Sequence, residues 1–253
     1  PLGYMHLAHF NEKTVGEMQK ALKDLKDRGA KGIIIDLRFN PGGLLRTAVE
    51  VSDHFLSEGT IVSTRGRSHP EKVFTAEAED EDLTDMPIVV LVNSYSASAS
   101  EIVTGALKDH DRATVVGAKT FGKGSVQSII RLPRDDGALK LTTARYYTPS
   151  GVCIDEIGVK PDIKVTLSDE KSAKLAQHLS SQLGYSAQQE QKQNPKNNGK
   201  KQKKNKDGKK KNGENKEEFK DVQLQRARKV LRNMLKQARL LKMGRAVAEG
   251  RSR

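Results

Sequence analysis

The stretch from Ile88 to Gln127 places the strongest constraint on how this chain can fold. A continuous apolar run, Ile88 to Val92, leads into a serine-rich turn, and a helical pattern follows that turn. A second apolar run, Thr114 to Val116, then precedes Lys123, which lies between two glycines. Short apolar runs bounded by turn residues are typical of strands that are covered on both faces. The pattern therefore predicts a buried sheet that carries a serine turn and a lysine loop.

The first 40 residues predict a β-α-β unit. A predicted strand covers residues 2–10, and Thr14 to Glu17 has the form of a capping box at a helix start. Gly29 suits the end of that helix, and a second buried strand covers residues 31–37. Such a connection favours parallel strands joined by a right-handed crossover. The fold class that we expect is therefore α/β.

The loop at residues 38–43 contains two adjacent glycines, Gly42 and Gly43. Adjacent glycines let the backbone turn sharply and expose its N–H groups. The other predicted elements are a helix at 47–56, a strand at 60–64, a polar surface excursion at 65–87, and strands at 125–132 and 138–146.

The positive charge of the chain is concentrated at its end. The whole chain of 253 residues has a formal net charge of +13. Residues 188–216 contain 11 Lys/Arg and 3 Asp/Glu, and residues 217–253 contain 11 and 4, so residues 1–187 carry −2. Attraction to acidic partners is therefore a property of the tail alone.

The tail divides into two parts. Apart from Pro195, residues 188–216 contain no apolar side chain, so burial cannot offset the entropy of ordering, and we expect disorder. From Phe219 an apolar stripe at helical spacing runs to Leu241 and predicts a helix that packs on the core or on a partner subunit. A basic helix on a membrane surface is the alternative. The domains that we expect are a core at 1–167, a helical extension at 168–187, the lysine-rich insert at 188–216, and an amphipathic helix with a basic tail at 217–253.

Three further features limit the class of protein. The single cysteine, Cys153, excludes an intrachain disulfide. No run of 18 apolar residues is present, so we expect no transmembrane span, and no signal peptide is recognisable. The chain starts at Pro1, directly on a predicted strand, which is typical of a fragment.

The serine turn and the lysine loop suggest nucleophilic catalysis. A serine hydroxyl needs a base, and none of the six histidines lies in a recognisable triad motif. Lys123 is the alternative base if burial lowers its pKa, although most lysines are exposed. If a helix starts near Ser98, the N–H of Ala99 and one from the loop of Gly42 and Gly43 are candidate oxyanion donors. Helix capping and small-residue packing explain the serines equally well.

Two binding functions compete with this interpretation. Residues 117–123 match the phosphate loop G-x-x-x-x-G-K, but Gly124 stands where Ser or Thr should hold Mg²⁺, and β-forming residues follow. The lysine-rich insert has neither arginine nor aromatic residues, so its contact with nucleic acid would be non-specific at best. Both observations argue against a nucleotide or nucleic-acid partner.

Four motifs in order resemble the carboxyl-terminal processing peptidases, also called tail-specific proteases. They are DLRFNPGG at 36–43, NSYSASASE at 93–101, GAKTFGKGSVQ at 117–127, and the residues from Tyr146 to Ile163. The resemblance implies a crotonase-like (ClpP/crotonase-type) core of ββα units with a C-terminal helical extension. It implies the following roles: Ser98 as nucleophile, Lys123 as general base, Gln127 as the residue that positions the lysine, and Ala99 with Gly42 or Gly43 as the oxyanion hole.

The resemblance also implies partners and a location. The substrates would be proteins or peptides with unstructured C-termini, no metal or cofactor would be needed, and the C-terminal helix would be a candidate for homo-oligomer assembly. The compartment would be the bacterial periplasm or cell envelope, and a PDZ domain would precede residue 2. An inactive peptide-binding or assembly module is the second hypothesis, and a nucleotide-binding protein is the third.

Overall fold

The computed structural model describes residues 1–67, 70–77, 86–132, 137–182 and 219–250. The chain forms two units, one of residues 1–166 with 222–253 and one of residues 167–221. In the second unit, α4 (Asp169–Gln182) is the helix predicted at 168–187. The predicted disordered insert at 188–216 lies outside the described residues. No helix within the described ranges is long and apolar enough to cross a bilayer.

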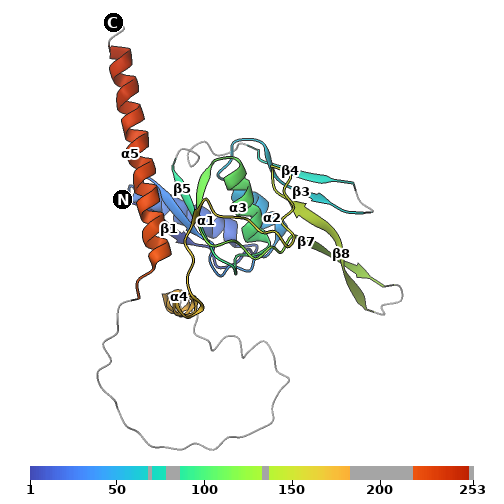
Figure 1. Ribbon diagram of the computed structural model, residues 1–253. Helices are drawn as coiled ribbons and strands as arrows, with labels where there is room; N and C mark the ends of the chain where they lie inside the picture. Colours follow the sequence, from blue (N-terminus) through green and yellow to red (C-terminus); the bar gives the residue numbers. More distant parts are fainter. Residues whose placement is uncertain (68–69, 78–85, 133–136, 183–218, 251–253) are drawn as a thin grey trace, which may run out of the picture. The chain divides into compact units, whose positions relative to one another are not determined.

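A parallel sheet forms the centre of the first unit (Figure 1). Its strand order is β1-β2-β5-β6-β9, and each neighbouring pair is parallel. The predicted β-α-β unit at the start of the chain is therefore confirmed. The strands are β1 (Gly3–His6), β2 (Ile33–Asp36), β5 (Ile88–Val92), β6 (Ala113–Gly117) and β9 (Ile163–Lys164).

Alternate side chains of the central strands enter two separate cores. Ile33 and Ile35 of β2 join one apolar cluster, whereas Ile34 between them joins the other. Side chains of α1, α2 and α3 contribute to the first cluster, and Ala227 and Leu231 of α5 contribute to the second. The sheet is thus covered on both faces, as its continuous apolar strands predict. The helices are α1 (Thr14–Asp27), α2 (Leu45–Asp53), α3 (Ala99–Asp109) and α5 (Val222–Gly250).

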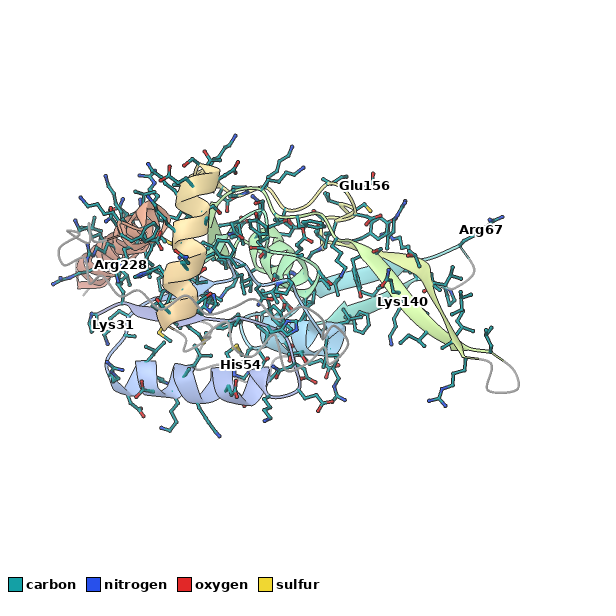
Figure 2. The ribbon with its side chains drawn as sticks, turned by 90° about the horizontal axis from the view of Figure 1, so that it is seen from below. Lys31, His54, Arg67, Lys140, Glu156 and Arg228 are labelled. Atoms are coloured by element: carbon teal, nitrogen blue, oxygen red, sulfur yellow. The ribbon has the colours of Figure 1, made fainter. Side chains whose placement is uncertain are left out.

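A second, antiparallel sheet has the order β4-β3-β8-β7. Its strands are β3 (Thr60–Arg65), β4 (Lys72–Thr75), β7 (Ser125–Arg131) and β8 (Ala138–Tyr147). The outer parts of β7 and β8 form an arm that extends away from the helices, with Lys140 on it (Figure 2). β7 begins two residues after Lys123, so the arm starts at the lysine loop.

The structure corrects two local predictions. The segment 65–87, predicted as a polar surface excursion, contains a strand, because β4 pairs with β3 there. β4 is a short edge strand with Val73 half exposed, so it has no alternating apolar signal. Thr14 is the first helical residue rather than the cap. Its hydroxyl accepts the Asn11 N–H and donates to the His9 carbonyl, each at 3.0 Å, so it stabilises the turn before the helix instead.

Candidate active site

Ser98 lies at a strained turn between β5 and α3. Its φ is 55° and its ψ is −113°, a backbone conformation that residues with a Cβ rarely adopt. Strain of this kind costs about 1–3 kcal/mol and is concentrated at functional sites. The neighbouring hydroxyls of Ser96 and Ser100 are fully buried and donate to the carbonyls of Leu37 and Asn40. Ser98 is half-buried, so it is the serine of this turn that is both strained and accessible.

Asn40 holds the glycine loop against this turn. Its side-chain oxygen accepts the Gly42 N–H at 2.8 Å, and its amide donates to the Leu7 carbonyl at 2.7 Å. Its own carbonyl accepts the Ala97 N–H and the Ser100 hydroxyl, each at 3.0 Å. One fully buried residue therefore connects the loop to both sides of Ser98.

The glycine loop and the start of α3 are in direct backbone contact. A Cβ on Gly42 would lie 2.6 Å from the Ala97 oxygen and 2.8 Å from both the Ala99 nitrogen and the Ser98 Cβ. Those distances are shorter than real Cβ contacts, and the φ of Gly42 is +99°. Only glycine fits this position, because both the space and the backbone conformation exclude a side chain.

The hydrogen bonds of the loop reduce the number of candidate donors for the oxyanion hole. The Gly42 N–H already donates to Asn40, so it is not free to bind a substrate oxygen. Among the described residues, neither the Gly43 N–H nor the Ala99 N–H has a protein acceptor. Ala99 is the first residue of α3, where the helix dipole is positive. Gly43 and Ala99 are therefore the two donors that remain.

Glu101 joins the serine turn to the lysine loop. Its carboxylate is fully buried, and one oxygen accepts the N–H groups of Ser98 and Lys123, each at 2.8 Å. The two amide nitrogens thus lie no further apart than twice that distance. The other oxygen accepts the Gly122 N–H at 2.7 Å and the Thr120 hydroxyl at 2.5 Å. Glu101 was not predicted as a site residue. Its bond to the Ser98 N–H has the three-residue spacing of a capping box, but its partners in the lysine loop follow it by 19 to 22 residues, beyond any helical spacing.

The Lys123 side chain is not buried, in contrast to the prediction. A Cβ on Gly124 would lie 2.1 Å from the Asp155 nitrogen, and one on Gly122 would lie 3.1 Å from the Glu156 carbonyl carbon. The two glycines therefore pack against the loop at 155–158, whereas Lys123 between them is exposed. Gln127 is exposed in β7 and makes no hydrogen bond with Lys123 in the described chain.

The nucleotide-binding hypothesis is wrong. A phosphate loop needs a helix N-terminus directly after the lysine. The residues after Lys123 instead form β7, which pairs with β8. No phosphate-binding helix end is therefore present at this loop.

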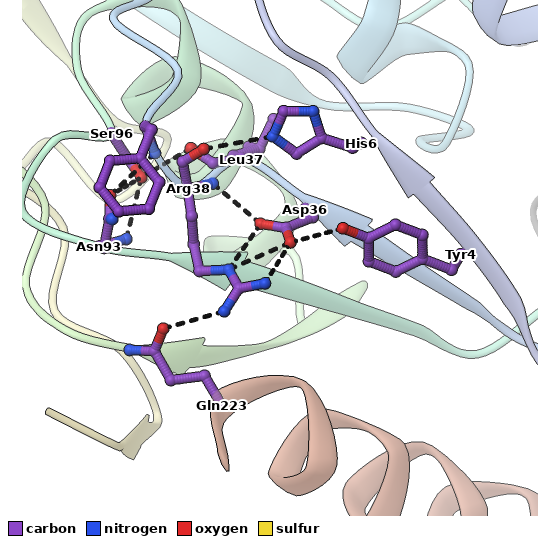
Figure 3. A network of polar contacts seen from close by, with 9 residues as sticks. Tyr4, His6, Asp36, Leu37, Arg38, Asn93, Ser96 and Gln223 are labelled. Atoms are coloured by element: carbon purple, nitrogen blue, oxygen red, sulfur yellow. Dashed lines mark hydrogen bonds and ion pairs between the residues drawn. The ribbon is translucent and has the colours of Figure 1, made fainter. Parts of the chain in front are cut away.

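A buried polar network lies directly before the glycine loop (Figure 3). Arg38 is fully buried and binds Asp36 with a closest N–O distance of 2.6 Å. Arg38 also donates to the side chain of Gln223 at 3.1 Å, and Gln223 donates to the Val165 carbonyl at 2.7 Å. The Tyr4 hydroxyl donates to Asp36 at 2.9 Å. The start of α5 is thus hydrogen-bonded to the residue that leads into the glycine loop.

A strained serine at a helix N-terminus, with a lysine loop beside it and two free N–H donors, is an arrangement of the serine peptidase class. The model of peptidase family S41 matches residues 1–165, and the chain belongs to this family.

Known relatives agree with this assignment. A carboxy-terminal-processing protease of Bartonella bacilliformis is 55% identical over 169 residues, which are 65% of this chain and 38% of that protein. A carboxyl-terminal-processing protease of Synechocystis is 46% identical over 161 residues, 64% of this chain and 37% of that protein. The solved photosystem II D1 C-terminal processing protease superposes with a TM-score of 0.62 at 39% identity, covering 65% of this chain and 42% of that one. The chain therefore spans about two fifths of the length of these relatives.

Proposed function

We propose that this protein is a serine endopeptidase that cleaves proteins near their C-termini, with Ser98 as nucleophile and Lys123 as general base. The observation that carries the proposal is the shared oxygen of Glu101, which holds the backbone of Ser98 beside that of Lys123. The names of the relatives support the C-terminal preference. A crotonase-like relationship of the core, a periplasmic or envelope location and assembly through α5 are parts of the same proposal.

The proposed reaction uses an acyl-enzyme intermediate. The neutral Lys123 amine takes the Ser98 hydroxyl proton while the oxygen attacks the substrate carbonyl carbon. The N–H groups of Gly43 and Ala99 stabilise the oxyanion. As the peptide C–N bond breaks, the Lys123 ammonium returns the proton to the leaving amine. Water, deprotonated by the same amine, then attacks the ester carbon. The Lys123 ammonium returns the proton to the Ser98 oxygen as the C–O bond breaks, which releases the acid product and free Ser98.

The exposure of Lys123 gives the substrate a part in this mechanism. A general base has to be neutral, and contact with water favours the charged form of an amine. A peptide chain lying over Lys123 would exclude water, and loss of water favours the neutral amine. Gln127, four residues along in β7, would then orient the desolvated amine. We infer that substrate binding completes the base.

The test is cleavage of an unstructured, apolar-tailed protein by the full chain, with products identified by mass spectrometry. Ser98→Ala and Lys123→Ala should each lower kcat at least about 1,000-fold. Lys119→Ala, an exposed lysine of the same loop, is the matched control and should keep the wild-type rate. Full activity of Lys123→Ala would refute the dyad. Tight peptide binding by a wild type that does not cleave would establish the inactive binding module instead.

A further inference from the structure

The solvent face of α5 carries a continuous basic stripe. The stripe consists of exposed Arg and Lys side chains that recur at spacings of one, three and four residues. At 3.6 residues per turn, they fall within an arc of about 100° along about 16 Å of helix. Figure 2 labels one of them, Arg228. The members of the basic stripe are Arg228, Lys229, Arg232, Lys236 and Arg239.

No acidic side chain on the helix neutralises this charge. The helix contains no Asp or Glu before Glu249. Within the described residues, none of the five side chains belongs to an ion pair. Residues 1–187 carry a net charge of only −2, so the positive charge of the stripe is not a general property of the chain before the tail. Five like charges along one face repel one another, and an anionic surface would relieve that repulsion.

The opposite face of α5 holds the stripe in a fixed orientation. Ala227 and Leu231 are fully buried against the parallel sheet. At the start of the helix, Gln223 links the Arg38 guanidinium to the Val165 carbonyl. The stripe is therefore presented by a helix that is anchored to the peptidase core.

We propose that the basic stripe of α5 binds the surface of a membrane that contains anionic lipids. Leu240 and Leu241 directly follow the stripe and are 68% and 69% exposed. Basic residues next to exposed leucines are the composition of helices that lie in a lipid interface. Residues 220–253 contain no aromatic side chain for base stacking, which favours lipid over nucleic acid.

Vesicle sedimentation of the full chain tests the proposal. Each basic residue near an anionic surface contributes a factor of about five to the partition coefficient. Wild type should bind vesicles of phosphatidylglycerol and phosphatidylcholine, should not bind phosphatidylcholine alone, and should be released by high salt. Replacing Arg232, Lys236 and Arg239 by Gln should lower the partition coefficient about 100-fold. Gln is a good helix former, so the helix should persist, which circular dichroism would verify.

A matched control removes three charges elsewhere. Lys20→Gln, Lys23→Gln and Lys26→Gln on the exposed face of α1 make the same change in net charge. This variant should bind almost as wild type does. An equal loss in both variants would show that net charge alone drives binding and would overturn the proposal. Unchanged binding by the stripe variant would also overturn it, because the lysine-rich segment at 188–216 would then be sufficient.

Two further arms separate lipid from other polyanions. Leu240→Ser with Leu241→Ser should weaken vesicle binding and leave binding to duplex DNA unchanged. If the leucine variant binds vesicles as wild type does, interfacial insertion is refuted. If the stripe is needed for DNA binding but not for vesicle binding, the surface belongs to nucleic acid and the proposal fails. None of these residues lies in the catalytic machinery, so peptidase activity on a soluble substrate should not change.

Discussion

Replacing Glu101 by Gln removes half of the acceptors that hold the candidate active site together. The carboxylate accepts four hydrogen bonds, two at each oxygen, while it is fully buried. A glutamine side chain has nearly the same shape but presents one oxygen and one NH₂ group. In either amide orientation, the NH₂ group would face two donors. Either Ser98 and Lys123 or Gly122 and Thr120 would lose their acceptor.

The expected loss of stability follows from the number of hydrogen bonds that the substitution removes. A hydrogen bond to a charged group contributes about 1.5–3 kcal/mol, and a buried donor without an acceptor adds its desolvation cost. Thr120 can rotate its hydroxyl to accept instead, so the amide should turn its NH₂ toward Thr120 and Gly122. We therefore expect the free energy of unfolding to fall by about 3–5 kcal/mol. Movement of the Gly122 backbone would displace Lys123 by a fraction of an ångström and lower kcat about 100-fold.

Urea unfolding followed by circular dichroism measures the stability, and peptide hydrolysis measures kcat. The control is Glu50→Gln, because Glu50 pairs with Arg46 on the exposed face of α2. Loss of that surface pair should cost less than about 0.5 kcal/mol. A loss below about 1 kcal/mol for Glu101→Gln, or an unchanged kcat, would refute the idea that this carboxylate holds the two loops together.

Three other substitutions test neighbouring parts of the structure. Gly42→Ala should lower kcat at least about 100-fold and destabilise the protein by about 2 kcal/mol more than Gly151→Ala does. Gly151 is the control because its φ is also positive but the space around it is open, and urea unfolding compares the two variants. Gln223→Ala should reduce the unfolding free energy by about 1–3 kcal/mol in the same assay, because the buried Arg38 loses an acceptor. Burial raises the pKa of Tyr146, so above about pH 10 its unfolded form ionises first and stability falls as pH rises. Tyr146→Phe should flatten that alkaline slope, and equal slopes in both proteins would contradict the burial argument.

The buried strands β2 and β5 of the central sheet could be predicted because their signal is local. Ile88 to Val92 is apolar at every position and ends at turn residues, and the structure places β5 on those residues. The same holds for β2, where Ile34 packs against α5 and its two neighbours pack on the other side. A strand that is covered on both faces needs no partner information to be recognised. The signal for α5, an apolar stripe at helical spacing, was also local. Ala227 and Leu231 of that apolar stripe are buried on the core, which is one of the two packing partners that the sequence predicts.

The parts that could not be predicted depend on long-range contacts. Glu101 looked like an ordinary first-turn acid of a helix, and only the folded chain brings the Gly122 and Lys123 amides to it. Gln223 meets Arg38 across 185 residues. The sequence could not decide whether Lys123 is buried, because flanking glycines can pack tightly without burying the side chain between them. They do pack tightly, but their packing against residues 155–158 directs the lysine away from the core.

The backbone and the side chains of the candidate site are therefore organised by different means. Glu101 and Asn40 use buried hydrogen bonds to fix the backbones of Ser98, Lys123 and Gly42 before any substrate is present. The Lys123 side chain itself is exposed. In the mechanism that we propose, Lys123 becomes the base only when a bound peptide excludes water from it. Under that proposal, substrate binding requires desolvation of one side chain and no rearrangement of the backbone that Glu101 and Asn40 hold.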